Sequence, residues 1–195
     1  MHRHTLAKRP TNPRKWWPVP VFLLLASIAH GQPLADRTAE FDGETLRYSI
    51  RAFASGAHVA SPGEKLEPTS ALNTAKLLNQ YLTAGKVEDA ALLSNAPRRR
   101  YAVLRDYEGS VGEENFKQVY AEYFLPQNRL VAEVVMAPHS LLVWHLREGD
   151  RYAGQYYVEI EGKVFMDDVP SAARLRLRRV LEAIRAGEIP LPIRQ

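Results

Sequence analysis

The spacing of apolar and polar residues changes period along the chain, and these changes divide it into predicted elements. Between residues 43 and 54 apolar and polar residues alternate, which is the period of a half-buried β-strand. Apolar residues then recur at steps of three and four up to residue 123, as in amphipathic helices. From residue 129 the period returns to two. The sequence therefore predicts a strand, a group of helices and a group of strands, in that order.

Local signals place the ends of the helices in the first half of the chain. The first helix begins at Thr69 or Ser70, since either is a favoured N-cap, and ends before Gly85. A short second helix follows directly. A third begins at Pro97, where proline suits the first helical position, and a fourth ends before Pro126.

The second half of the chain predicts a β-meander and a final helix. Alternating strands are expected at about 129–137, 140–148, 151–161 and 163–169, joined by short turns. The final helix, Ser171 to Ala186, carries its apolar residues on one side and arginines on the remainder. The fold class is therefore α+β, with N-terminal helices packed on an antiparallel meander, an extra N-terminal strand and a C-terminal amphipathic helix.

The first 29 residues differ from the rest and predict a signal peptide. A basic region precedes PVPVFLLLASIA, an uncharged apolar run of about a dozen residues. Spanning a bilayer takes about 20 residues, so a permanent anchor is the weaker interpretation. Small residues allow cleavage after Ala29 or after Gly31, and the pattern leaves both open.

The remaining chain is interpreted as one domain. Residues 30–42 show no periodicity and are expected to be a flexible segment, followed by a single α+β domain at 43–195. After cleavage the protein is expected to be periplasmic or secreted. The sequence contains no cysteine, which excludes disulfides, thiolate metal sites and a lipoprotein anchor.

Charge argues against nucleic acid as a partner. The chain has 26 basic and 22 acidic residues, but five of the basic residues lie in the predicted signal peptide, which leaves 21 against 22. A near-neutral mature protein lacks the positive field that nucleic-acid binding requires. The five leader residues are Arg3, Lys8, Arg9, Arg14 and Lys15.

A glutamate and a histidine in neighbouring predicted strands form the candidate catalytic pair. If Pro138, His139 and Ser140 make a three-residue turn, Glu133 lies opposite His145 on the outer face of the sheet. The carboxylate would then orient the imidazole as a base. The alternative, which we favour, is a cross-strand charge pair on a solvated or dimer-forming face.

The same strands supply candidates for binding. Trp144, Tyr152 and Tyr156 are predicted to share the helix-facing side of the sheet and to line any cavity there, although aromatic residues at these positions also suit a plain core. An outward apolar strip is predicted to form a homodimer interface. It consists of Val131, Val135, Leu141 and Val143.

Metal and cofactor chemistry find no support in the sequence. No Gly-rich phosphate loop is present, and we expect no cofactor. The histidines show no metal-ligand spacing, so we expect no metal site. They are His2, His4, His30, His58, His139 and His145.

Two arginine clusters remain to be explained. Arg98, Arg99 and Arg100 open the third helix, where they either splay into water or meet an anion or nearby acids. Residues 170–195 contain six arginines against two glutamates. This helix either matches the acidic turns of the same domain or contacts an acidic partner or a membrane. The membrane contact, which is not favoured, would use Arg174, Arg178 and Arg185.

The order of elements resembles a known superfamily. Helices containing YLTAGKVEDAALLS, followed by strands ending YYVEIEGKVFMDDV, resemble the nuclear-transport-factor-two-like fold, a cystatin-like α+β cone, over about residues 70–169. The resemblance implies a curved sheet around a long helix, a pocket between them and a dimer through the outer sheet face. The strand at 43–54 and the final helix lie outside that core, and the family's acid–base residues have no equivalents here.

We therefore expect a non-catalytic, exported domain that binds a small apolar ligand or a protein partner. One alternative is a cofactor-free isomerase, dehydratase or hydrolase that uses His145 as base with Glu133. The other is an interaction protein that acts through its arginine-rich C-terminal helix.

Overall fold

The chain is described by a computed structural model that covers residues 32–192, except residues 42 and 62. The predicted signal peptide and both predicted cleavage sites lie outside the described residues. Among the described residues, no helix is long and apolar enough to cross a membrane.

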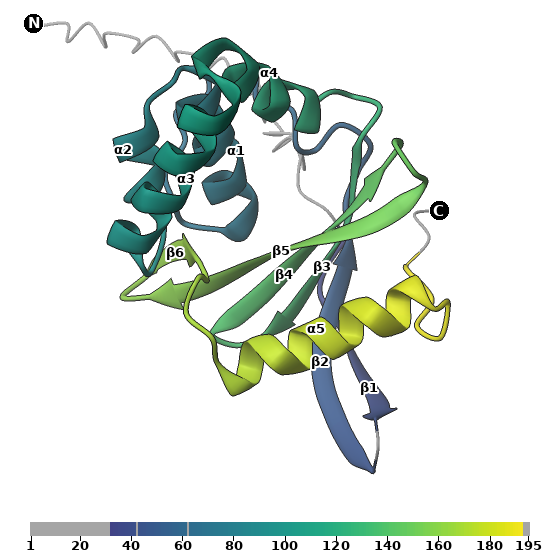
Figure 1. The fold of residues 1–195 in the computed structure, drawn as a ribbon. Helices are drawn as coiled ribbons and strands as arrows, with labels where there is room; N and C mark the ends of the chain where they lie inside the picture. Colours follow the sequence, from purple (N-terminus) through teal and green to yellow (C-terminus); the bar gives the residue numbers. More distant parts are fainter. Residues whose placement is uncertain (1–31, 42, 62, 193–195) are drawn as a thin grey trace, which may run out of the picture.

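The described chain forms one antiparallel sheet whose strands lie side by side in sequence order (Figure 1). Each strand pairs with the next, so the predicted meander extends to the whole sheet. The strands are β1 (Ala35–Phe41), β2 (Glu44–Ala52), β3 (Arg129–Met136), β4 (His139–Leu146), β5 (Arg151–Ile160) and β6 (Lys163–Met166).

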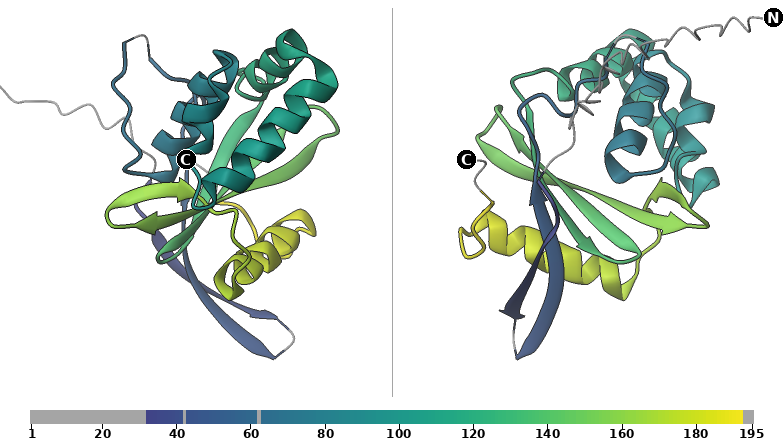
Figure 2. Two further views of the ribbon diagram at one scale, coloured as in Figure 1. Left: turned by 60° about the vertical axis from the view of Figure 1, so that its left-hand side comes forward. Right: turned by 180° about the vertical axis from the view of Figure 1, so that it is seen from behind.

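Helices cover both faces of this sheet, which gives the α+β fold that the sequence predicts. One layer contains α1 to α4, and α5 lies alone on the opposite face (Figures 1 and 2). The helices are α1 (Ala71–Thr83), α2 (Val87–Ala91), α3 (Pro97–Val111), α4 (Glu113–Tyr123) and α5 (Ala172–Arg185).

Local capping explains the helix boundaries. Ser70 is the N-cap of α1 and accepts a hydrogen bond from the backbone N–H of Asn73 at 3.2 Å. Ser171 caps α5 in the same way. After α1, Gly85 takes a φ of 71°, a conformation that a residue with a side chain rarely adopts. Pro97 occupies the first turn of α3, as predicted.

The segment expected to be flexible contains the edge strand β1. It pairs with β2 through a turn that includes Gly43, and the hairpin projects beyond the rest of the molecule (Figure 1). Only Ala35, Ala39 and Phe41 of this strand are partly buried. A strand with so little apolar surface has no periodic signal to predict it from, and its charged side chains are typical of a protected edge.

The predicted register between β3 and β4 is wrong. The turn is two residues long, Ala137 and Pro138, so Glu133 lies opposite Leu142 and not opposite His145. A bulge at Val131 shifts the register again, and Arg129 becomes the partner of His145. A register shift by an odd number of residues exchanges the faces of a strand relative to its neighbour, so Ala132 and Val134 of β3 do not share a face with Trp144 as predicted.

The two sheet faces carry separate cores. Leu141 and Val143 face α5 and pack with Leu177, Val180 and Leu181. Leu142 and Trp144 face α1 on the other side, in a second core that includes Tyr157. Trp144 and Tyr156, predicted to share one face, therefore lie on opposite faces.

Candidate functional site

The predicted acid–base pair is separated in the structure. Glu133 is buried and paired with Arg51, whose Nε donates to it at 2.7 Å. Burial raises the pKa of Glu133, while Arg51 opposes the change. His145 lies beside the exposed Asp150, with 2.7 Å between Nε2 and the carboxylate, and its ring contacts Tyr152. No hydrogen bond joins Glu133 to His145, so the proposed dyad has no geometric basis.

The three predicted cavity residues do not come together either. Trp144 is fully buried among Tyr123, Phe124 and His58 on the side of α1 to α4. The ring of Tyr152 makes a tilted contact with that of His145, near the start of β5. Only Tyr156 lines a sizeable cavity, and that cavity lies on the opposite face from Trp144.

The apolar strip predicted as a dimer interface is not an exposed surface. Leu141 and Val143 are completely buried beneath α5. Val131 and Val135 are partly buried. The prediction failed because α5 packs on this face of the sheet, so Leu141 and Val143 lie against a helix and not against solvent. A homodimer stays a prediction, but this strip does not carry it.

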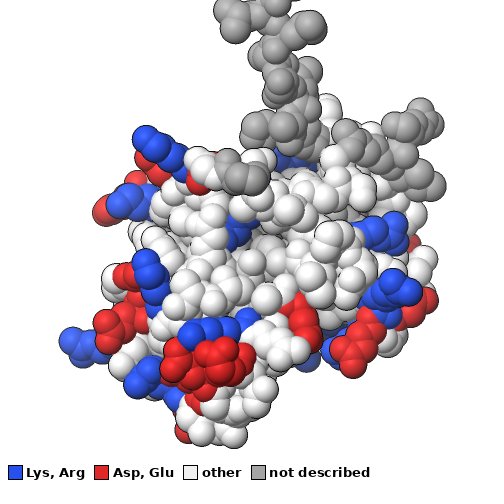
Figure 3. Space-filling view, turned by 90° about the horizontal axis from the view of Figure 1, so that it is seen from above, with Lys and Arg blue, Asp and Glu red and all other residues white. Residues whose placement is uncertain are grey.

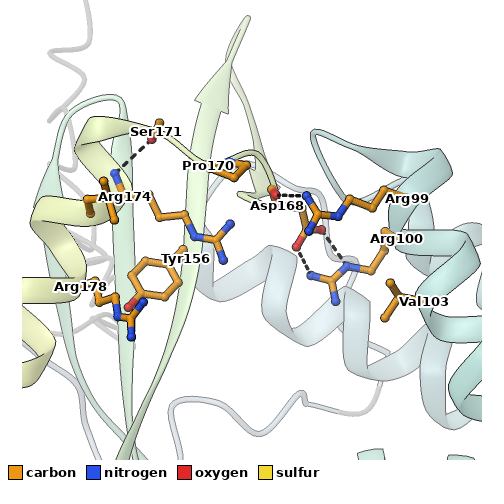
Figure 4. Close-up of a pocket in the computed structure, with 10 residues that line it drawn as sticks. Arg99, Arg100, Val103, Tyr156, Asp168, Pro170, Ser171, Arg174 and Arg178 are labelled. Carbon is orange, nitrogen blue, oxygen red and sulfur yellow. Dashed lines mark hydrogen bonds and ion pairs between the residues drawn. The ribbon is translucent and has the colours of Figure 1, made fainter.

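A cleft of about 570 Å³ lies between α3 and α5. This volume lies within the range of about 300–1,000 Å³ that is usual for small-molecule sites. We call it the α3–α5 cleft (Figure 4). Its lining contains four arginines and one aspartate, which is a formal surplus of three positive charges. The lining residues are Arg99, Arg100, Val103, Tyr156, Asp168, Pro170, Ser171, Arg174, Leu175 and Arg178.

One wall of the cleft is held by an ion pair between α3 and the end of β6. Arg100 binds Asp168 with two hydrogen bonds, of 2.8 Å from Nε and 2.6 Å from Nη2. Ser94 also donates to Asp168, at 2.6 Å. A bidentate pair of this kind fixes orientation as well as charge. Asp168 therefore neutralises Arg100 and holds the start of α3 beside β6.

Arg99 stands next to this pair on the same wall. Its only described hydrogen bond is a long one of 3.5 Å to the backbone oxygen of Asp168. Figure 4 shows Arg99 and Arg100 on the α3 side of Asp168, with Arg174 and Arg178 on the other side of the cleft. The guanidinium of Arg99 thus adds a charge to this wall that no side-chain carboxylate in the described chain neutralises.

The arginines of α5 divide into two groups. Arg176 and Arg179 both bind the carboxylate of Glu44 on β2, each at 2.8 Å. Arg174 and Arg178 instead line the cleft. Arg176 and Arg179 are therefore matched by an acidic residue of another element, but this residue is Glu44 and not one of the acidic turns that the sequence suggested.

The two cleft-facing arginines of α5 have weak or no carboxylate partners in the described chain. Arg178 lies 4.0 Å from Glu182, at the limit of an ion pair. The guanidinium of Arg174 lies over the ring of Tyr156, 5.2 Å from its centre, in a cation–π contact. Burial raises the pKa of Tyr156, so its hydroxyl is a neutral hydrogen-bond donor at physiological pH.

Apolar side chains complete the lining. Val103 on α3 is 56% exposed and Leu175 on α5 is 61% exposed, and both belong to the cleft. Single exposed apolar residues are common on protein surfaces, but these two line the same cleft, so a molecule bound there would cover both. The cleft can therefore hold an anionic group and an apolar group at the same time.

The face seen in Figure 3 carries charges of both signs. Basic and acidic side chains lie next to each other around its rim, uncharged residues fill most of its centre, and no single-sign patch extends across it.

The other polar cluster considered, around Asp167 and His139, has less room for a ligand than the α3–α5 cleft. Asp167 is buried, accepts from Asn95 at 2.8 Å and lies 3.0 Å from Nδ1 of His139. The cavity that His139 lines measures only about 150 Å³. No group of three or more His, Asp or Glu residues in the described chain could hold a metal ion.

The sequence shows both arginine clusters but not their convergence. Arg99 and Arg174 lie 75 positions apart, and only the packing of α3 and α5 around β6 brings their side chains to one cleft. The exposed Val103 and Leu175 are the signal that was missed, because each interrupts the polar face of a helix.

Comparison with protein-family models, with curated proteins and with solved structures finds no match for this chain.

Proposed function

We propose that this protein is a non-catalytic binding domain whose ligand is a small amphiphilic anion held in the α3–α5 cleft. The observation that carries the proposal is the division of the α5 arginines. Two of them bind Glu44, while Arg174 and Arg178 face a cavity that also holds Tyr156. An anionic group would accept hydrogen bonds from Arg174, Arg178 and the Tyr156 hydroxyl.

Shape favours a small molecule over a membrane surface as the ligand. A membrane would require arginines on one convex face, whereas these arginines line the two walls of a concave cleft. Of the three arginines considered for membrane contact, Arg185 is bound to Glu182 and to the backbone oxygen of Tyr152. Arg185 is therefore already paired, and it does not line the cleft.

Export of the protein and its fold resemblance are further proposals. The basic and apolar pattern of residues 1–29 supports export to the periplasm or the medium. The likeness to the nuclear-transport-factor-two-like fold stays a prediction and adds nothing to the proposed ligand. The enzyme alternative loses its main support, because Glu133 and His145 do not meet.

Fluorescence of 8-anilinonaphthalene-1-sulfonate tests the proposal, because this probe joins a sulfonate to an apolar ring system. We expect the purified protein to enhance its fluorescence. We expect the double substitution Arg174→Gln/Arg178→Gln to weaken binding at least about tenfold, since charge-assisted hydrogen bonds contribute about 1.5–3 kcal/mol each. Added salt should weaken wild-type binding as well, because the cleft is open to solvent.

The matched control is Arg176→Gln/Arg179→Gln. It removes the same charge from the same helix, but from side chains bound to Glu44. We expect it to change the affinity for the probe by less than about twofold. Equal losses in the two double variants would mean that only net charge matters, and the proposal would be wrong.

A further inference from the structure

The α3–α5 cleft has arginines with weak or no carboxylate partners on both walls, and this arrangement indicates the charge of its ligand. Arg174 and Arg178 lie on the α5 wall, and Arg99 lies on the α3 wall (Figure 4). Arg100 does not add to these, because its charge is bound to both oxygens of Asp168. A ligand with a single charge would satisfy one wall and leave the other unpaired.

We propose that the cleft binds a phosphate monoester that carries an apolar body. This inference rests on the proposed function, that the cleft binds an amphiphilic anion. A phosphate monoester carries about 1.5 to 2 negative charges at neutral pH and three terminal oxygens. It can therefore accept hydrogen bonds from Arg99 on one wall and from Arg174 and Arg178 on the other. A carboxylate or a sulfate ester has only one charge to share.

Two exposed apolar side chains of the cleft indicate that the ligand also has an apolar part. Val103 and Leu175 stand on opposite walls and expose more than half of their surface. An alkyl or aryl group on the phosphate would cover both and remove apolar surface from water. Inorganic phosphate lacks this group and should bind more weakly than the ester.

The second ionisation of the phosphate gives the inference a pH signature. That ionisation has a pKa of about 6, whereas arginine stays charged throughout. The affinity for an alkyl phosphate should therefore rise between about pH 5.5 and about pH 7.5. The affinity for an alkyl sulfate, which is a monoanion at both values, should stay constant.

Competition against the fluorescent sulfonate probe tests this with octyl phosphate, octyl sulfate and inorganic phosphate. At about pH 7.5 we expect octyl phosphate to bind about tenfold more tightly than octyl sulfate, and at about pH 5.5 we expect this ratio to shrink. Equal affinities of the two octyl esters at both pH values would overturn the inference and leave the proposed function intact. Failure of both esters to compete would overturn the proposed function itself.

Substitution of Arg99 locates the second charge. We expect Arg99→Gln to weaken octyl phosphate more than octyl sulfate, so that the tenfold ratio falls to about twofold. Arg98→Gln is the matched control, because Arg98 is the exposed neighbour outside the cleft lining, and it should leave the ratio unchanged. A ratio that survives Arg99→Gln would remove the α3 wall from the site and overturn the assignment.

Phosphate monoesters occur both free in solution and as lipid headgroups, and a further measurement separates these sources. Binding of the protein to vesicles that contain phosphatidic acid, with loss of binding in Arg99→Gln, would identify a membrane lipid as the source. Competition by octyl phosphate without vesicle binding would identify a soluble ester.

Discussion

The two faces of the sheet are covered differently, and the difference explains where the molecule is closed and where it is open. On one face, α1 to α4 surround Trp144, whose ring lies 5.0 Å from that of Phe124 and 5.1 Å from that of Tyr123. On the other face α5 packs alone. That helix crosses the sheet and packs against β3, β4 and β5. The α3–α5 cleft forms where this cover ends.

The same type of residue has different roles on the two faces of the sheet. Tyr157 and Tyr156 are neighbours on β5 and point to opposite faces. Tyr157 is fully buried in the closed core and donates to Gln155, while Tyr156 is partly exposed in the cleft beneath Arg174. Substitutions on the closed face should therefore change stability, whereas substitutions in the cleft should change binding.

The largest expected effect comes from the closed face. Trp144→Ala removes a completely buried side chain from among His58, Tyr123 and Phe124, and leaves a cavity that these rings cannot fill. We expect the free energy of unfolding to fall by about 3–5 kcal/mol. Urea denaturation followed by circular dichroism measures this change. A loss of less than about 1 kcal/mol would show that the face is less tightly packed than the structure indicates.

A smaller loss of stability is expected at the contact between α5 and β5. A Cβ atom added at Gly154 would lie 2.6 Å from Cδ2 of Leu181 and 2.7 Å from Cδ1 of Leu141. We expect Gly154→Ala to push α5 away from β5 and to lower the free energy of unfolding by about 1–3 kcal/mol. Gly109→Ala, at an exposed helical site with open space around it, is the control and should not destabilise the protein.

The closed face also predicts a pH dependence of stability. His58 is 1% exposed, its Nδ1 has no hydrogen-bond partner in the described chain, and burial lowers its pKa from the usual 6.5. The unfolded chain therefore takes up a proton at a higher pH than the folded chain does. The contribution of His58 to the free energy of unfolding should be constant above about pH 6.5. Below about pH 6.5 this free energy should fall by at most about 1.4 kcal/mol per pH unit.

Denaturation of wild type and of His58→Gln over a pH series checks this prediction. The variant loses the titrating group, so the part of the slope that is due to His58 should disappear between about pH 6.5 and about pH 5. The nearby charge of Lys76, which also lowers the pKa of His58, is present in both proteins. Identical slopes in the two proteins would mean that His58 is protonated while buried.

The helices and most strands could be predicted because their signals are local. Ser70, Gly85 and Pro97 act within one turn of their own position, and the structure places helix ends at all three. The edge strand β1 was missed because it buries little apolar surface. The helix-facing side of β4 was predicted correctly, but the faces of β3 and β5 were exchanged relative to it, because turn length and the bulge at Val131 leave no mark on the alternating pattern.

The sequence could predict individual residues of the candidate site but not how they come together. The sequence marks Arg98 to Arg100 and the arginines of α5 as two unexplained clusters, and it marks Tyr156 as a cavity residue. It cannot show which arginines are neutralised, because Arg100 meets Asp168 and Arg176 meets Glu44 across long stretches of chain. The cleft depends on those pairings, which are tertiary.

The smallest effect on stability, and the sharpest test of the comparison, is expected at Tyr156. Tyr156→Phe removes a hydroxyl that makes no hydrogen bond in the described chain, while the ring under Arg174 remains. We expect the free energy of unfolding to change by less than about 0.5 kcal/mol. Binding of the sulfonate probe should weaken about threefold to tenfold, because one donor to the anion is lost.

Tyr157→Phe, at the neighbouring residue, is the matched control. It should lower the free energy of unfolding and leave probe binding unchanged, since it breaks a buried hydrogen bond to Gln155 and does not touch the cleft. If both variants weakened binding equally, the hydroxyl of Tyr156 would not be a ligand, and the anion would be held by the arginines alone.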